Sequence, residues 1–314
     1  MKDIAVFGGT AHPELAREIC AHLGVALLPA SKQRFANDCL EVQLQANCRE
    51  RDVFLIQPLV PPVQERLMEL FLMLDAARGA SAARTTAVIP FYAYARSDKK
   101  DAPRISIGGR LVADLLVAAG ASRLLTMALH SPQVHGFFSV PVDHLHARRE
   151  LAQHFRRRDL TNAVVVSPDL GYAKEASAFA RMLGVPMAAG AKQRISDERV
   201  SITSVIGEVT GREAIVIDDE IANGTTIFEL MARLRERQVR GFRIACTHGI
   251  FAGEVLSRLE DTADVLEVVS TNTVPIPPGK RTPKLTVLSI AAALAEAMRR
   301  IHEGESVSAL FDLS

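Results

Sequence analysis

Short apolar runs alternate along the chain with longer segments whose apolar residues recur at the spacing of a helix. In the first half, the predicted strand and helix pairs are residues 3–7 and 13–23, 53–57 and 62–77, and 85–90 and 107–119. A strand-then-helix order predicts a largely parallel sheet with helices on both faces. The sequence therefore predicts an α/β fold.

The same alternation restarts in the second half, with predicted pairs at residues 163–166 and 172–183, 214–217 and 226–237, and 242–247 and 253–259. Between the halves, the run "HLHARRELAQHFRRRD" is rich in charge and follows a compact turn at residues 141–143. We interpret this run as a solvated stretch and place a boundary near residue 146. The predicted domains are residues 1–146 and 147–314.

Composition narrows the classes of function. The chain has 314 residues, and its 37 basic and 36 acidic side chains give a net charge of +1, which excludes a polybasic nucleic-acid coat. Aromatic residues make up 5% of the chain and Trp is absent, so a stacking platform for single strands is not expected. We predict a protein that binds no nucleic acid.

Cysteine spacing and apolar run length bear on location. The four cysteines form no C-x-x-C pair and no zinc spacing, which is typical of a reduced, cytoplasmic protein. No apolar run reaches the roughly 18 residues that span a bilayer, so no membrane segment is predicted. The signatures of Walker-type kinases, dinucleotide enzymes, zinc proteases and α/β-hydrolases are missing.

The most informative segment is "AIVIDDEIANGTTIFELMARLRER" at residues 214–237. Its apolar run predicts a strand with Asp218 and Asp219 at the carboxyl end, where ligands of open α/β sheets bind. The turn from Asn223 through Gly224 and Thr225 to Thr226 precedes a helical pattern, so its backbone N–H groups can receive an anion. A capped helix after a buried strand is the structural alternative. The two adjacent carboxylates, which suit a sugar diol or hydrated Mg²⁺, favour a phosphosugar site.

This segment resembles the phosphoribosyl-pyrophosphate (PRPP) binding loop of type I phosphoribosyltransferases and ribose-phosphate pyrophosphokinases. Six further segments resemble the second family in the same order: "HPELAREICAHLGV", "MELFLMLDAARGASA", "IPFYAYARSDKK", "LHSPQVHGFFSVPVDHL", "VVVSPDLGYAKEA" and "HEGESVSALF". The resemblance implies two phosphoribosyltransferase-like domains, each a mostly parallel sheet flanked by helices, with the last helix packing back on the N-terminal domain. A phosphoribosyltransferase, with its single domain, would leave half of the chain unexplained.

Two segments are expected to contact the nucleotide phosphates. Arg96, Ser97 and Asp98 follow a predicted strand, and a guanidinium with a carboxylate suits a triphosphate and its metal. The family has Gln where Ser97 stands. The resemblance implies that His130 is catalytic and lies near the phosphates and Mg²⁺, although a lone His after a strand is more often structural.

By resemblance, the loop at residues 34–44 binds adenine. Phe35 corresponds to the residue that sandwiches the base, and Asp38 and Glu41 to acidic residues that contact the amino group or the ribose. Two extra residues and the missing Gly imply a different loop geometry from that of the family.

The resemblance also assigns residues to the metal and to a lid. It places Asp169, at the end of a predicted strand, near the metal or the ribose phosphate. Lys192 and Arg194 lie in a polar stretch without helical or strand period, which we interpret as a mobile lid, with a solvated hairpin tip as the alternative. In the family, a Lys-x-Arg pair neutralises charge during transfer.

Three departures remove acidic residues of the family pattern: Ala128, Ser139 and Ala222, with Asn223 in place of Thr. Each removes an oxygen ligand or an anion, and the loss of one metal ligand can weaken affinity about tenfold or more.

The activity implied is transfer of the diphosphoryl group of Mg-ATP to ribose 5-phosphate, giving PRPP and AMP in a homo-oligomer of dimers stacked into hexamers. The departures keep two alternatives open. One is a non-catalytic regulatory subunit, and the other is a diphosphotransferase with another pentose phosphate or nucleotide.

Overall fold

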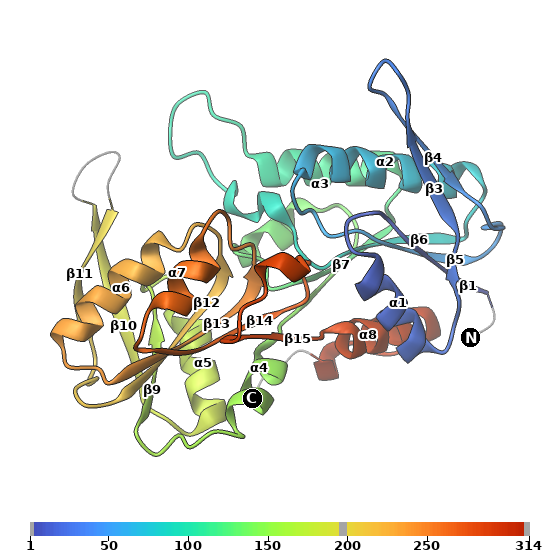
Figure 1. Cartoon of the computed structure of the whole chain (residues 1–314). Helices are drawn as coiled ribbons and strands as arrows, with labels where there is room; N and C mark the ends of the chain where they lie inside the picture. The colour runs from blue at the N-terminus through green and yellow to red at the C-terminus, as the bar shows by residue number, and fades with distance from the viewer. Residues whose placement is uncertain (1–2, 195–199, 311–314) are drawn as a thin grey trace. The chain divides into compact units, whose positions relative to one another are not determined.

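The computed structural model describes residues 3–194 and 200–310, which divide into two compact units (Figure 1). The described residues of the first unit are 3–146, 273–275 and 289–310. Those of the second are 147–194, 200–272 and 276–288. Each unit is built on its own largely parallel sheet with flanking helices, so the predicted α/β fold is confirmed.

The sheet of the first unit has six strands in the order β2-β1-β5-β6-β7-β8, and every neighbouring pair is parallel. Its strands are β1 (Ile4–Gly8), β2 (Leu27–Leu28), β5 (Asp52–Ile56), β6 (Arg84–Ile89), β7 (Arg123–Met127) and β8 (Val142–Leu145). Because all strands run the same way, the loops that follow them gather at one edge of the sheet.

Helices cover both faces of this sheet. They are α1 (Pro13–Leu23), α2 (Val63–Gly79), α3 (Gly108–Ala119) and α8 (Ala291–Glu303). The helices α2 and α3 contact each other on one face, and α8 packs against α1 on the other (Figure 1). The bounds of α1 match the prediction, because local signals fix both of its ends: His12 Nδ1 accepts from Leu15 N at 3.3 Å, and Gly24 ends it at φ 68°.

A separate antiparallel ribbon of β3 (Ala30–Arg34) and β4 (Leu40–Leu44) packs along α2. Two basic side chains of the ribbon face carboxylates of this helix. Lys32 Nζ lies 2.8 Å from Glu65 Oε1 and 3.4 Å from Glu69 Oε2, and Arg34 Nη2 lies 2.6 Å from Glu65 Oε2.

In its described residues, the second unit has a sheet of seven strands in the order β11-β10-β9-β12-β13-β14-β15, of which only the pair β10 and β11 is antiparallel. The strands are β9 (Ala163–Ser167), β10 (Met187–Arg194), β11 (Val200–Ile206), β12 (Glu213–Ile221), β13 (Gly241–Gly249), β14 (Val265–Thr271) and β15 (Leu285–Leu288).

Two apolar clusters, one on each face of this sheet, form the core of the second unit. The helices α6 (Thr225–Glu236) and α7 (Val255–Asp261) contribute to one cluster, and α4 (Arg148–Phe155) and α5 (Ala173–Leu183) to the other. Short 3-10 turns complete the described structure: η1 (Ala93–Arg96), η2 (Pro132–Phe137), η3 (Pro278–Lys280) and η4 (Ser308–Leu310). Over residues 3–194 and 200–310, no helix has the length and apolar character to cross a bilayer.

Two expectations from the sequence are wrong. The charged run after residue 146 is not simply solvated, because Arg148–Phe155 form α4 and bury Leu151, Ala152 and Phe155. The stretch around Lys192 and Arg194, which shows no strand period in the sequence, is part of a strand, since residues 189–194 pair with β11; this agrees with the hairpin alternative. Residues 195–199 of the predicted lid lie outside the described residues.

Candidate active site

The acidic pair lies on β12, which continues two residues beyond it to Ile221. Asp219 is buried and Asp218 partly exposed, and Asp218 Oδ1 accepts a hydrogen bond from Asp219 N at 2.9 Å. Burial raises the pKa of Asp218 well above its usual value, and the nearby carboxylates of Asp219 and Asp169 raise it further. The pair is therefore poised to accept positive charge or hydroxyl donors.

The turn after β12 is shaped by Asn223 and Gly224. Asn223 Oδ1 accepts from Thr225 N at 3.2 Å, and Gly224 adopts φ 71° with the side chains of Phe228 and Val255 close to its Cα. A Cβ at Gly224 would lie 3.0 Å from the Phe228 ring, so both backbone angle and space favour glycine. The helix α6 begins at Thr225, and its N-terminal N–H groups give this end of the sheet the polarity that favours an anion.

Asp169 follows β9, the strand beside β12, and thus lies at the same edge of the sheet. Its Oδ1 accepts from Tyr172 N at 3.1 Å, and its carbonyl oxygen accepts from Ser167 Oγ at 2.6 Å. The carboxylate therefore also fixes the start of α5. These contacts hold the conformation of the Asp169 loop.

Two further groups near the acidic pair, Tyr172 and Cys246, were not predicted from the sequence. Burial raises the pKa of the Tyr172 phenol, and Asp219 and Asp218 raise it further. Cys246 is the register partner of Asp218 on β13, and burial raises the pKa of its thiol to about 12. Its position directly after the Asp169 loop is the one feature of the sequence that could have pointed to Tyr172 as a residue near the acidic pair. Cys246 stays a protonated, inert thiol at neutral pH.

In the first unit, the loops after β6 and β7 are joined by a hydrogen bond from Ser131 Oγ to Asp98 Oδ2. The structure thus brings the segment of Arg96, Ser97 and Asp98 close to the segment that contains His130. The side chains of Arg96 and His130 are exposed. Both can face solvent-borne phosphates from one edge of this sheet.

Ser97 has a structural role at this edge. Its Oγ accepts from Gly108 N at 2.8 Å and lies 3.4 Å from the Ser106 carbonyl oxygen, to which it donates. Gly109 N donates to the Ser97 carbonyl oxygen at 2.9 Å. Ser97 therefore closes the loop at residues 98–107 and supports the start of α3.

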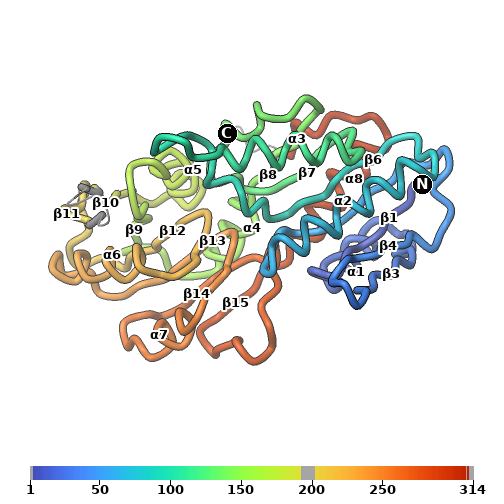
Figure 2. Tube along the Cα trace, turned by 90° about the horizontal axis from the view of Figure 1, so that it is seen from above, coloured from blue at the N-terminus to red at the C-terminus, as the bar shows by residue number. Residues whose placement is uncertain are grey.

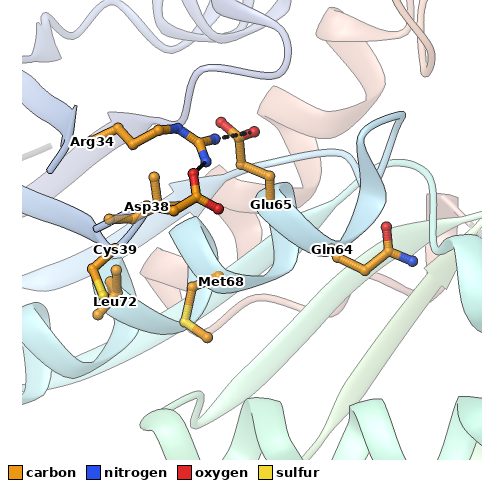
Figure 3. Close-up of a pocket in the computed structure, with 8 residues that line it drawn as sticks. Arg34, Asp38, Cys39, Gln64, Glu65, Met68 and Leu72 are labelled. Carbon is orange, nitrogen blue, oxygen red and sulfur yellow. Dashed lines mark hydrogen bonds and ion pairs between the residues drawn. The ribbon is translucent and has the colours of Figure 1, made fainter. Parts of the chain in front are cut away.

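The predicted adenine-binding residues lie on the β3–β4 ribbon. Phe35 is 46% exposed at its tip, Asp38 adopts φ 70°, and Glu41 Oε1 accepts from Gln33 Nε2 at 3.1 Å. The guanidinium of Arg34 joins the carboxylates of Asp38 and Glu65 (Figure 3).

A pocket of about 520 Å³ lies between the ribbon and α2. Its lining residues are Arg34, Asp38, Cys39, Leu40, Gln64, Glu65, Met68 and Leu72 (Figure 3). Of the three predicted adenine residues, the lining includes Asp38 and omits Phe35 and Glu41. The pocket thus does not gather the predicted set.

Lys192 and Arg194 lie near the end of β10, opposite Ile202 and Val200 of β11. The register shifts between Ala191 and Lys192, which marks a β-bulge. The backbone therefore places both residues on a strand hairpin, next to the undescribed residues 195–199.

The oxygens around Asp218 suit a magnesium ion, although no three His, Cys, Asp or Glu side chains of the described chain converge as a metal cage. Mg²⁺ is usually bound through one or two carboxylates, with waters and substrate phosphates completing its shell. The carboxylates of Asp169 and Asp219, which raise the pKa of Asp218, would be compensated by such a cation. The donor set thus fits Mg²⁺ carried in with phosphates.

Comparisons with known proteins cover nearly the whole chain. Two family models match it: the N-terminal domain of ribose phosphate pyrophosphokinase at residues 4–120, and the phosphoribosyl synthetase-associated domain at residues 190–312. A relative from Streptomyces coelicolor is 72% identical over 312 residues, which cover 99% of this chain and 98% of the relative. A ribose-phosphate pyrophosphokinase from Deinococcus radiodurans is 48% identical over 313 residues and 98% of both chains.

A solved structure agrees with these matches. The phosphoribosylpyrophosphate synthetase from Mycobacterium smegmatis has a TM-score of 0.91 at 41% identity, over 96% of this chain and 100% of that one. Similarity of this extent in sequence and in structure shows the family: this chain belongs to the ribose-phosphate pyrophosphokinases.

Proposed function

We propose that this chain transfers the β,γ-diphosphoryl group of ATP to the C1 hydroxyl of ribose 5-phosphate, giving PRPP and AMP. The C1 oxygen bonds to the β-phosphorus, the bond from that phosphorus to the bridging oxygen of the α-phosphate breaks, and the hydroxyl proton leaves to solvent. The observation that carries the proposal is the acidic pair of β12 with the helix-starting turn behind it, in a chain that belongs to this family along its length.

In the second unit, we assign the acidic pair to the sugar. Asp218 and Asp219 would accept hydrogen bonds from the ribose hydroxyls, a role supported by their place near the carboxyl end of β12. Asn223, Gly224, Thr225 and Thr226 would hold the 5-phosphate at the start of α6, where N–H groups and the helix dipole favour an anion. Binding would thereby orient the C1 hydroxyl for attack.

In the first unit, Arg96 and His130 would contact the triphosphate, since both are exposed at the edge where β6 and β7 end. Asp98 and Ser97 would shape this binding loop, because Asp98 accepts from Ser131 and Ser97 holds the start of α3. Phosphoryl transfer requires mainly position and charge neutralisation from the protein, and these side chains can supply both.

Lys192 and Arg194, on β10, are proposed to neutralise the charge of the diphosphoryl group during transfer. His130, in the loop after β7, and Asp169, in the loop after β9, are proposed to contact Mg²⁺. When bound, Mg²⁺ would neutralise phosphate charge. Phe35, Asp38 and Glu41 are proposed to bind the adenine nucleotide. We further propose that the chain forms a homo-oligomer and acts in the cytoplasm.

Turnover by the purified chain with ATP, Mg²⁺ and ribose 5-phosphate tests the function. We expect AMP and PRPP in equal amounts, and no product when ribose 5-phosphate is omitted. Binding of both substrates without turnover would favour the regulatory subunit instead. A higher kcat/KM for another pentose phosphate or nucleotide would reject these substrates.

The variant Ala128→Asp sharpens this assay. It restores an acidic residue that the family has, at a position where the backbone has φ 46°, an angle that Asp tolerates better than Ala. We expect the Mg²⁺ concentration for half-maximal rate to fall about tenfold, by analogy with changes in metal surroundings.

A further inference from the structure

The chain bends sharply between β7 and His130. The strand β7 ends at Met127. The next residue, Ala128, has φ 46°, a left-handed backbone angle that residues other than Gly rarely adopt. Ala128 N donates to Leu145 O at 2.8 Å, which ties the bend to the neighbouring strand β8. Because this backbone conformation is unfavourable in isolation, surrounding contacts must hold it.

His144 of β8 supplies such a contact. Leu129 N donates to His144 Nε2 at 2.8 Å, and Leu129 is 5% exposed, so its N–H needs a partner inside the protein. The strands β7 and β8 lie side by side, with Thr126 opposite His144 (Figure 2). An accepting Nε2 carries no proton, so the neutral ring carries its proton on Nδ1.

Contacts on each side of His144 and His130 make the arrangement specific. The rings of His144 and His146 lie 4.8 Å apart at 45°, which restricts the orientation of the His144 ring. On the other side of His130, Ser131 donates to Asp98, and its carbonyl oxygen accepts from Val134 N at 3.1 Å. His130 is therefore an exposed residue between two anchored neighbours.

We propose that His144 is a positioning residue for the reaction: by holding the peptide of Leu129, it sets where the His130 imidazole meets the nucleotide phosphates. This inference rests on the proposed function only for the role of His130. The hydrogen bond that it invokes, from Leu129 N to His144 Nε2, does not depend on that role. No transfer of a proton by His144 is involved.

Two variants separate the accepting atom from the ring. His144→Phe keeps a ring without an acceptor, and His144→Gln places an amide oxygen near the position of Nε2. We expect His144→Phe to lower kcat roughly tenfold, as loss of a supporting contact typically does, with the KM for ribose 5-phosphate within about twofold. His144→Gln should recover kcat to within about threefold. His135→Gln, which changes an exposed histidine of η2, is the matched control.

A double-mutant cycle tests whether the effect passes through His130. In the His130→Ala background, His144→Phe should cause little further loss, because the group that it positions is already absent. An equal loss in both backgrounds would overturn the proposal. A kcat of His144→Phe equal to that of the wild type would also overturn it, as would a loss of kcat in His144→Gln as large as that in His144→Phe.

Amide hydrogen exchange at Leu129 provides a readout that needs no turnover. Protection should be high in the wild type and His144→Gln and lost in His144→Phe, while melting temperatures report whether each variant folds. If the wild type yields no PRPP, the proposed function fails, and the positioning role is then judged by this exchange and by the affinity for Mg-ATP. Equal protection of the Leu129 amide in the wild type and both His144 variants would overturn the positioning role of His144.

Discussion

Glu267 and Asp218 are carboxylates of one sheet with opposite pKa shifts. Glu267, near the amino end of β14, is 6% exposed and lies 2.7 Å from both His154 Nε2 and Arg158 Nη2, and 3.1 Å from Arg243 Nη1. Burial alone would raise the pKa of Glu267, but hydrogen bonds from Arg158 and His154 outweigh it and the pKa is lowered. At the carboxyl end, burial and two carboxylate neighbours raise the pKa of Asp218.

The difference lies in the partners of each carboxylate. Residues of other elements surround Glu267 with cations, so it stabilises the fold. The acidic pair faces further negative charge, which costs stability unless a ligand brings positive charge or hydroxyl donors. One end of the sheet thus compensates its buried carboxylate with cations, and the other holds carboxylates close together.

The largest expected effect comes from Asp218→Asn. An amide removes the cost of a second charge beside Asp219 but loses an acceptor for the substrate, so we expect turnover to fall at least about a hundredfold. The melting temperature without ligand should rise at pH 7.5. Assays of PRPP formation and calorimetry measure the two effects. Glu254→Gln, an exposed carboxylate of the same unit, is the control. A variant with near wild-type activity would show that Asp218 does not serve the substrate.

Glu267→Gln should instead lower the melting temperature and leave turnover nearly unchanged. Without the charge, Arg158 and Arg243 both lose their ion pair with residue 267, while Arg243 keeps its ion pair with Glu213. Loss of one partner of a buried ion pair costs about 3–5 kcal/mol, and we expect the lower end because Arg158 is partly exposed. At about 2 °C or more per kcal/mol, the melting temperature should fall by about 6 °C. The kcat at 25 °C should stay within about twofold, and a large loss of kcat with unchanged melting temperature would contradict the comparison.

The pH dependence of stability should separate the two carboxylates. The contribution of Asp218, whose pKa is raised on folding, is complete below the unfolded value of about 4 and is lost as pH rises through the folded value. The pKa of Glu267 is lowered on folding. Its contribution to stability is therefore present above the pKa of the unfolded state and is lost as pH falls through the pKa of the folded state. Calorimetry from about pH 2 to 8 should therefore show the gain from Asp218→Asn growing as pH rises above about 4, and the loss from Glu267→Gln shrinking as pH falls below about 4. Parallel curves for all three proteins would contradict both assignments.

The smallest effect is expected from Thr286→Val. Thr286 Oγ1 donates to Glu267 Oε1 at 3.3 Å, a long hydrogen bond beside several charged ones. Its removal should cost about 0.5–1 kcal/mol, or about 1–3 °C, with kcat unchanged. A loss as large as that of Glu267→Gln would mean that the charged partners contribute little.

Elements with strong local patterns were predictable from sequence. The apolar spacing of Ile227, Leu230, Met231 and Leu234 predicted a helix after the acidic pair, and all four residues are buried on α6. The helix α4 was missed, and a hairpin at β10 was only the alternative prediction, because charged or polar residues mask the apolar positions. Pairing with β11 provides the hydrogen bonds that make the polar stretch of β10 a strand.

Contacts over long sequence separations were out of reach. Glu267 meets Arg158 across 109 residues and His154 across 113. The contact of His144 with Leu129 spans 15 residues and depends on the β7–β8 register, which no local pattern specifies. Ser97 likewise lies in a motif of ligand-binding appearance, but its hydroxyl supports α3.

The sequence by itself determined the alternation of strands and helices, the parallel arrangement that follows from it, and the acidic pair at a strand end, because each depends on neighbouring residues and backbone propensity. Only the tertiary structure decided which carboxylates face cations and which face each other. Electrostatic free energy depends on distance and burial in three dimensions, so a carboxylate is compensated by cations at one end of the second sheet and lies beside other carboxylates at the other end.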